Sequence, residues 1–286
     1  MAIRMAPANN RIGISFSRHQ LSVRLKYIRQ IRCYIGQDAP PVATILQSAV
    51  CRTTDRARPC PTMFYFPGLS SHSIWNNDKE NRQSTNVYKL FPWLKELEKS
   101  TNINAMRAEY ESLIKNGIES DYSTKDKTRE GGEHKMHTGD WSWHTMISKG
   151  KRLENFEKKC PVTASLINKY VGDDLMTDVP FAFTFFSTLH CKSSIAPHAA
   201  ACNLRLRIHL PLIGVSDNKF DCGLRVGDEL VPWKEGEAIV FDDAYEHEVW
   251  NHTKKDRVVL LFDIWHPELT TNERQAITEM FQSVKK

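Results

Sequence analysis

The sequence predicts a mainly β protein with a sandwich or barrel core and helical flanks. Three observations support this: short apolar runs of strand length follow one another after residue 180, turn residues separate them, and one run alternates apolar with basic side chains. The chain has 286 residues, of which 41% are hydrophobic and 10% aromatic. That composition is ordinary for one large or two small globular domains, and it excludes wholesale disorder.

The first 60 residues differ in composition from the rest of the chain. They hold ten Lys or Arg and two Asp, a net charge of +8, which leaves −3 for residues 61–286 out of a total of +5. This Arg-rich, acid-poor segment has no apolar core of the kind that secretory signals carry, and it suits a transit peptide or, equally, a disordered extension. We therefore predict a basic extension over residues 1–60 and a folded domain over residues 61–286.

Charge and hydropathy also narrow the function classes. The folded part is nearly neutral and shows no Lys/Arg stripe, so we expect no nucleic-acid partner. No window approaches 18 consecutive apolar residues, so we expect no transmembrane span or anchor. The expected compartment is the cytoplasm or an organelle.

Residues 61 to about 130 mix loop and helix. Apolar side chains recur there at i, i+4, i+7 and i+8, a spacing that predicts an amphipathic helix ending near Gly117. The residues with this spacing are Met106, Tyr110, Leu113 and Ile114. Residues 119–134 are polar, contain two adjacent glycines and predict an exposed loop.

From residue 181 onward the sequence predicts six short strands, which place the β core at about 180–268. The predicted strands are Phe181–Leu189, Leu204–Leu210, Leu224–Val231, Ala238–Phe241, His247–Trp250 and Val258–Trp265.

The second of these strands alternates strictly. Four aliphatic side chains fall on one face, and Arg205, Arg207 and His209 share the other. On an isolated strand this would be an ordinary half-exposed pattern. Its surroundings favour another interpretation, because His198 lies just upstream, and His247 follows 49 residues after His198.

Arg257, at the head of the last apolar run, completes this group of histidines and arginines. Neutral imidazoles suit a divalent transition metal, and guanidinium groups bind a small carboxylate through two parallel hydrogen bonds. Together these residues predict a metal site that also holds an anionic cosubstrate.

An ordered series of short motifs over roughly residues 61–275 resembles the aspartyl/asparaginyl β-hydroxylase family of iron- and 2-oxoglutarate-dependent oxygenases. The motifs are Gly139-Asp140-Trp141-Ser142, Gly150-Lys151-Arg152, Glu154-Asn155, Cys160-Pro161, Pro197-His198, Asn203 to Leu210, Trp233 to Gly236, Phe241-Asp242-Asp243, Glu246 to Trp250 and Trp265 to Thr270. The resemblance implies a double-stranded β-helix, a jelly-roll or cupin-like barrel with the metal at its mouth.

The resemblance also implies a role for each site residue. His198 and His247 would be the catalytic pair that binds Fe(II). Arg207 and His209 would lie by the chelating end of 2-oxoglutarate, and Ser187 and Arg257 would hold its distal carboxylate. Asp140 and Arg205 match positions that meet the substrate, although Asp140 could equally cap a turn or helix.

Two features of the sequence leave questions open. Most non-haem iron oxygenases carry a carboxylate two residues after the first His, where this chain has Ala200. Water would fill that position in this family, and Asp242 or Asp243 are the alternative third ligands. Phe185 stands where animal members carry a basic residue, which leaves the identity of the substrate open.

The expected function is therefore that of a dioxygenase, an oxidoreductase that uses O2 and 2-oxoglutarate to hydroxylate an Asp or Asn residue of a peptide or protein. The alternative is a cupin-like binding protein that does not catalyse or that uses another metal.

Overall fold

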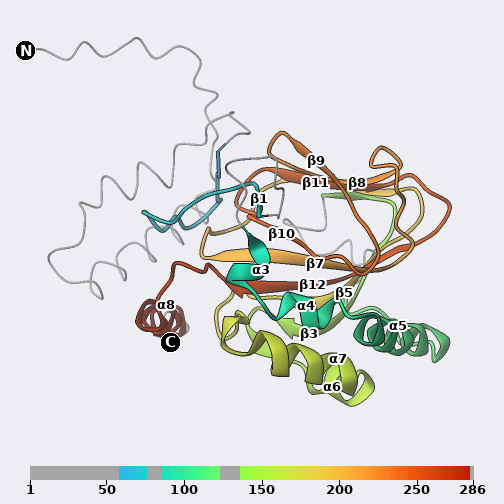
Figure 1. The fold of residues 1–286 in the computed structure, drawn as a ribbon, viewed down its shortest axis with the longest axis horizontal. Coiled ribbons are helices and arrows are strands. Elements are labelled where there is room, and N and C mark those ends of the chain that lie inside the picture. Colours follow the sequence, from blue (N-terminus) through green and yellow to red (C-terminus); the bar gives the residue numbers. More distant parts are fainter. Residues whose placement is uncertain (1–57, 76–85, 123–135, 284–286) are drawn as a thin grey trace, which may run out of the picture.

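The fold is that of a computed structural model, which describes residues 58–75, 86–122 and 136–283. The predicted basic extension therefore lies outside the described residues apart from its last three positions. In the described part of the chain the mainly antiparallel strands form two facing sheets, and most of the helices lie against one of them (Figure 1). The predicted mainly β class is confirmed.

The larger sheet has the strand order β1-β10-β7-β12-β5-β3-β4. Its strands are β1 (Ile74–Trp75), β10 (Ile239–Phe241), β7 (Arg205–Ile213), β12 (Arg257–Trp265), β5 (Thr184–Leu189), β3 (Trp141–Ser148) and β4 (Lys151–Arg152). The smaller sheet has the order β2-β6-β11-β8-β9. Its strands are β2 (His137–Thr138), β6 (Ser193–His198), β11 (His247–Asn251), β8 (Cys222–Val226) and β9 (Glu229–Pro232).

Strands β5 to β12 pass back and forth between the two sheets, with β5, β7, β10 and β12 in one and β6, β8, β9 and β11 in the other. This alternation is the double-stranded β-helix that the sequence predicts. One predicted strand, Leu224–Val231, is in fact a hairpin of β8 and β9. Its two-residue turn begins at Gly227, whose positive φ of 59° suits a tight hairpin.

The helices from α3 to α7 cover the outer face of the larger sheet, whereas α8 packs in a separate cluster that includes Phe64 and Trp265 (Figure 1). The helical segments are α3 (Val87–Leu90), α4 (Leu94–Leu97), α5 (Ser100–Lys115), α6 (Glu154–Lys159), α7 (Pro161–Leu166), a π turn (Ile167–Val171), a 3-10 turn (Gly172–Asp174) and α8 (Thr271–Ser283). The predicted helix is α5, although Ile114 is 51% exposed and Ile103 occupies the buried face instead. The helix ends at Lys115, and Gly117 follows with a positive φ, so that Ile118 N donates to Leu113 O in a common C-terminal cap.

The alternation of β7 has an unexpected consequence for burial. Its aliphatic side chains pack outward against the helices, with Leu206, Ile208 and Leu210 all fully buried. Its basic side chains therefore point into the space between the two sheets, which we call the barrel interior. Both faces of the larger sheet are covered, one by helices and the other by the smaller sheet. The basic face of β7 is therefore not a solvent-exposed face, and the half-exposed interpretation of this strand does not apply.

Residues 58–75 run across the loops that join the sheets. Cys60 N donates to Ala244 O at 2.7 Å, and Thr62 N donates to Ala200 O at 2.8 Å. Asp242 N in turn donates to Ser73 O at 3.1 Å. The segment thus ties the loop after β6 to the loop between β10 and β11.

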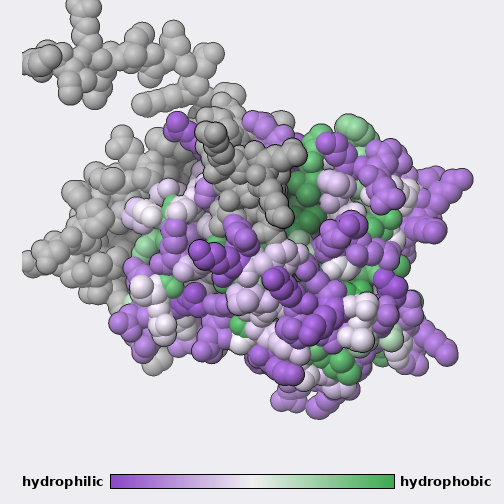
Figure 2. All heavy atoms as spheres, in the orientation of Figure 1, coloured by the Kyte–Doolittle hydropathy of each residue, from purple (hydrophilic) through white to green (hydrophobic). Residues whose placement is uncertain are grey.

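Hydrophilic side chains dominate the described surface in this orientation, and apolar residues form smaller patches (Figure 2). Within the residues that the structure describes, none of the helices combines the length and apolar character that a bilayer crossing requires.

Candidate metal and cosubstrate site

The two predicted metal ligands, His198 and His247, lie side by side. They are directly opposite each other in the β6–β11 ladder, and their ring centroids are 4.1 Å apart. A register irregularity follows His247 on β11, and such bulges commonly accompany functional sites because they redirect a side chain. The structure therefore brings together two histidines that are 49 residues apart in the sequence.

The same local geometry orients both imidazoles. Nδ1 of His198 lies 2.8 Å from Ala196 O, and Nδ1 of His247 lies 2.9 Å from Tyr245 O. A carbonyl oxygen only accepts, so Nδ1 carries the proton in each ring and Nε2 carries the lone pair. Burial, followed by the neighbouring His198, lowers the pKa of His247 well below its usual value. Neutral rings with a lone pair on Nε2 are the form that binds a divalent metal.

Among the residues that the structure describes, no carboxylate joins this pair. Among the described residues, no three His, Cys, Asp or Glu side chains are grouped as a metal site would require. Ala200 is buried, and Ala200 N donates to Asp243 O at 2.7 Å. The carboxylates of Asp242 and Asp243, the alternative third ligands, make other contacts.

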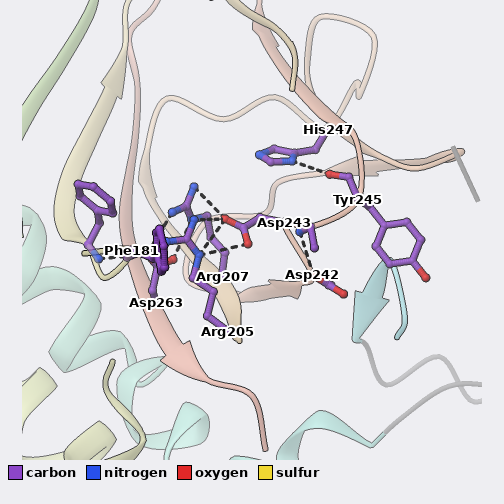
Figure 3. Close-up of polar contacts among 10 residues, drawn as sticks. Phe181, Arg205, Arg207, Asp242, Asp243, Tyr245, His247 and Asp263 are labelled. Carbon is purple, nitrogen blue, oxygen red and sulfur yellow. Dashed lines mark hydrogen bonds and ion pairs between the residues drawn. The ribbon is translucent and has the colours of Figure 1, made fainter. Parts of the chain in front are cut away.

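Asp243 belongs to a buried network of ion pairs next to the histidines (Figure 3). Its Oδ2 lies 2.6 Å from Arg205 Nη2 and 3.2 Å from Arg207 Nη1. Asp263 binds the same two guanidinium groups, at 3.0 Å to Arg205 Nη1 and 2.8 Å to Arg207 Nε. The carbonyl of Phe181 accepts a further hydrogen bond from Arg205. The network joins β7 and β12 to the loop that precedes His247.

The charges in this network stabilise one another. Burial alone would raise the pKa of Asp243, but Arg205 and Arg207 hold it well below its usual range. Burial alone would likewise lower the pKa of Arg205, but Asp243 and Asp263 raise it. The substrate-binding role predicted for Arg205 remains a prediction, and in this structure its guanidinium donors are engaged by carboxylates and a carbonyl.

We expect Asp243→Ala to lower the free energy of unfolding by about 3–5 kcal/mol, because it leaves two buried guanidinium groups with one carboxylate. Urea unfolding followed by circular dichroism measures the change. Glu154→Gln is the control, because its pair with Lys158 is exposed on both sides and should contribute nothing measurable. Equal stability of the two variants would contradict the role of the network.

Asp242 points away from this network, and its carboxyl keeps a proton to higher pH than an exposed aspartate does (Figure 3). Burial, then the neighbouring charge of Asp243, raises its pKa to about 8. Ala244 N donates to its carboxyl at 2.9 Å, and Ser71 Oγ lies 3.4 Å away.

Because the unfolded carboxyl titrates near 4, the native state keeps a proton between about pH 4 and pH 8 that the unfolded chain has lost. The contribution of Asp242 to the unfolding free energy therefore decreases as pH rises through this window. We expect Asp242→Asn to flatten the pH dependence between pH 5 and 8, measured as urea unfolding at each pH. Parallel curves for both proteins would contradict this assignment.

Arg257 is the most unusual residue of the barrel interior. It is fully buried, and none of its three guanidinium nitrogens has a hydrogen-bond partner among the described residues. The guanidinium carbon lies 4.7 Å from the centroid of the Trp233 ring. Burial lowers the pKa of Arg257 to about 10, so the group remains charged at neutral pH. A buried cation with unsatisfied donors is costly unless an anion binds it.

The other predicted cosubstrate residues line the same interior. Ser187 faces Val259 in the β5–β12 ladder, two residues from Arg257, and its hydroxyl accepts a hydrogen bond from Trp141 Nε1 at 2.9 Å. His209 is buried, and its Nδ1 has no partner among the described residues. Burial, then the charges of Arg257 and Arg207, lower the pKa of His209 well below its usual value.

Asp140 lies at the edge of the barrel and is exposed. Its backbone N donates to Ser193 Oγ at 2.9 Å, and a side chain on the preceding Gly139 would collide with that hydroxyl. Gly139 and Asp140 thus allow the turn between β2 and β3 to pack closely against β6. The predicted role of Asp140 in substrate binding remains a prediction.

Aromatic rings line the side of the interior formed by β3 and β5. The ring of Trp143 stacks on Phe185 at 4.3 Å and 19°, and on its other face Tyr122 lies at 4.5 Å and 15°. Trp143 Nε1 has no hydrogen-bond partner among the described residues. The residue that departs from the animal pattern, Phe185, is thus part of a continuous stack.

Sequence reasoning missed two contributors to this site. Asp263 is the lone carboxylate in the apolar strand β12, and a buried charge in such a run requires a counter-ion, which was a usable signal. Trp233 lies against Arg257 from the loop after β9, and nothing in its sequence position indicates that contact.

A known protein family and several individual proteins are similar to this chain. The model of a family described as aspartyl/asparaginyl beta-hydroxylase matches residues 100–267, which include the histidine pair, the ion-pair network and Arg257. Human aspartyl/asparaginyl beta-hydroxylase is 30% identical over 207 residues, which are 72% of this chain and 26% of that protein. The ornithine lipid ester-linked acyl 2-hydroxylase of Rhizobium tropici is 35% identical over 181 residues, 62% of this chain and 58% of that protein.

Human aspartate beta-hydroxylase domain-containing protein 2 is 25% identical over 227 residues, 77% of this chain and 54% of that protein. The chain thus spans about a quarter of the human β-hydroxylase and little more than half of the other two relatives. Because the family model covers more than half of the residues, including every strand from β3 to β12, the chain belongs to the aspartyl/asparaginyl beta-hydroxylase family.

Proposed function

We propose that this protein is an Fe(II)- and 2-oxoglutarate-dependent dioxygenase that hydroxylates an Asp or Asn residue of a peptide or protein. The observation that carries the proposal is the buried guanidinium of Arg257, which has no hydrogen-bond partner among the described residues, in the same interior as the adjacent His198 and His247 rings. Family membership supports the same chemistry.

The donors that the chain presents fit both groups. The Nδ1 atoms of His198 and His247 are held by backbone carbonyls, which places the lone pair of each of these adjacent rings on Nε2. Arg257 offers to a carboxylate the guanidinium donors that have no partner among the described residues. Ser187 supplies a hydroxyl from β5, opposite Val259, which is two residues after Arg257 on β12. When bound, iron and 2-oxoglutarate supply the oxidising power: one atom of O2 enters the product hydroxyl, the other enters succinate, and CO2 leaves.

The protein's own contribution is binding, orientation and exclusion of water. We assign the distal carboxylate of 2-oxoglutarate to Arg257 and Ser187, and its keto-acid end to the neighbourhood of Arg207 and His209. The apolar interior residues around them, such as Val259 and Leu261, keep bulk water from the reaction. The ion-pair network holds the loop before His247 in place.

Two measurements test the proposal. An anaerobic titration of the full chain with 2-oxoglutarate should show binding that requires Fe(II), and aerobic incubation should form succinate. The absence of metal-dependent binding would overturn the proposal. Metal binding without any formation of succinate would favour the cupin-like alternative.

A further inference from the structure

We infer that Trp233 is a further cosubstrate-binding residue, whose indole N–H donates to the distal carboxylate of 2-oxoglutarate and whose ring holds the Arg257 guanidinium in place. This assignment rests on the proposed function, and it adds a residue that favours a dicarboxylate over a 2-oxo acid with a single carboxylate. Three observations carry it: the burial of Trp233, its contacts with Arg257 and His209, and the polar atoms that these three residues leave without partners.

Polar atoms without partners are concentrated around Trp233. The residue is 1% exposed, and its Nε1 has no hydrogen-bond partner among the described residues. The same holds for all three guanidinium nitrogens of Arg257 and for Nδ1 of His209. A buried indole N–H usually finds a partner, and a buried guanidinium without one is costly. These atoms, on three neighbouring residues, indicate a common polar partner that the described residues do not supply.

Contacts between rings connect Trp233 with both ends of the predicted cosubstrate site. The guanidinium carbon of Arg257 lies 4.7 Å from the centroid of the indole. The His209 ring is stacked against the indole, at 6.0 Å between centroids and 28° between planes. Phe241 continues the series, because its ring lies 4.9 Å from His209 and 5.7 Å from the predicted metal ligand His247. Trp233 therefore lies at the Arg257 end of a series of ring contacts that leads to the histidine pair.

The polar atoms at this end of the series favour an anion. A guanidinium and an indole N–H can only donate, so their common partner has to accept several hydrogen bonds. A carboxylate offers about four acceptor positions on two oxygens, and its charge offsets that of Arg257. The proposed function already assigns the distal carboxylate of 2-oxoglutarate to Arg257, and Trp233 Nε1 supplies one more donor. Hydrogen bonds to charged groups are stronger than neutral ones, so this donor should contribute measurably to affinity.

The loop that carries Trp233 is held in place by the rest of the fold. Trp233 directly follows β9, and Gly236 N donates to Pro211 O on β7 at 2.9 Å. Glu235 is paired with Arg107 of α5 at 2.9 Å. The indole is therefore positioned before any ligand binds, which lowers the entropic cost of binding.

A substitution that removes the N–H but keeps an aromatic ring tests the inference. The full chain with Trp233→Phe is titrated anaerobically, in the presence of Fe(II), with 2-oxoglutarate and with 2-oxovalerate, which carries a methyl group in place of the distal carboxylate. We expect the affinity for 2-oxoglutarate to fall about tenfold or more, or about 1.4 kcal/mol, and the affinity for 2-oxovalerate to stay within about twofold. A merely structural role would lower both affinities equally. Equal changes for the two acids, or no change for either, would overturn the inference.

Two further variants separate the ring from its N–H group. Trp233→Leu also loses the contact between the ring and the Arg257 guanidinium, so it should bind 2-oxoglutarate more weakly than Trp233→Phe does. Trp75→Phe is the matched control. Trp75 is also buried, and its Nε1 has no partner among the described residues, but it belongs to the apolar cluster on the outer face of the larger sheet. This control should leave both affinities unchanged, and a loss as large as that in Trp233→Phe would count against the inference.

A second measurement uses the unmodified chain, in case Trp233→Phe does not fold. The chain is loaded with Zn(II), which has no redox chemistry, and the NMR signals of its indole N–H groups are recorded with each of the two acids. We expect one indole proton to lie further downfield with 2-oxoglutarate than with 2-oxovalerate, because a hydrogen bond to a carboxylate deshields the proton. Indole signals that coincide for the two acids would overturn the inference.

Failure of the inference is separable from failure of the proposed function. The titration of the wild-type chain reports on the proposed function alone, and the absence of metal-dependent binding there would overturn both. If the wild-type chain binds 2-oxoglutarate with its metal and Trp233→Phe binds it equally well, only the role of Trp233 is wrong.

Discussion

Replacing Arg257 with methionine is expected to weaken the binding of 2-oxoglutarate by about 30-fold or more and, in the same protein, to raise the free energy of unfolding. The first effect follows because removing one partner of a buried, hydrogen-bonded charge pair costs about 2 kcal/mol or more. The second follows because the guanidinium is fully buried with no hydrogen-bond partner among the described residues, so without the cosubstrate its desolvation is uncompensated.

The two effects are measured separately, by anaerobic calorimetric titration with 2-oxoglutarate and by urea unfolding without it. Arg257→Lys is the matched control, since it keeps the charge and loses the bidentate geometry, and it should bind more tightly than the methionine variant. Arg257→Met with lower stability and unchanged affinity would show that the residue is structural. Weaker binding of 2-oxoglutarate together with a higher free energy of unfolding is the result that distinguishes a binding residue from a structural one.

Replacing His247 with alanine is expected to reduce metal affinity by about 100-fold or more and to abolish the formation of succinate. Groups that only orient a metal ligand are worth 10–100-fold, so loss of the ligand itself should exceed that range. His247 is buried, and its ring is held by Tyr245 O. Titration with Co(II), followed by its visible absorption, reports on the site directly.

His252→Ala is the matched control for this experiment. His252 follows β11, is exposed, and should leave both affinity and turnover unchanged. Retention of full Co(II) affinity in His247→Ala would place the metal elsewhere and remove the basis of the proposed function.

The amino-acid pattern was sufficient to predict the strands in which periodicity is clear. On β7 the alternation correctly placed Arg205, Arg207 and His209 on one face. It could not show that this face is buried, because burial depends on the smaller sheet that covers it, and the residues of that sheet are distant in sequence.

Five strands were not predicted: the two-residue strands β1, β2 and β4, and the longer strands β3 and β6. The two longer ones were missed for identifiable reasons. β3 is buried on both faces, so Trp141 to Ser148 show no alternation by which to recognise a strand. β6 is short, polar and contains Pro197, which sequence rules assign to an edge or a loop. The ion-pair network was missed for a related reason, because Asp263 meets Arg205 and Arg207 only when β12 pairs with β7.

The position of β12 in the larger sheet affects how the protein reaches its native state. The strand lies between β7 and β5, although it follows them in the chain by more than 40 residues. During synthesis the edges of β7 and β5 that face β12 therefore remain unpaired until residues 257–265 leave the ribosome. Folding dominated by such long-range pairing is slow, and open strand edges favour aggregation. The nascent chain should thus depend on chaperones until that strand is inserted.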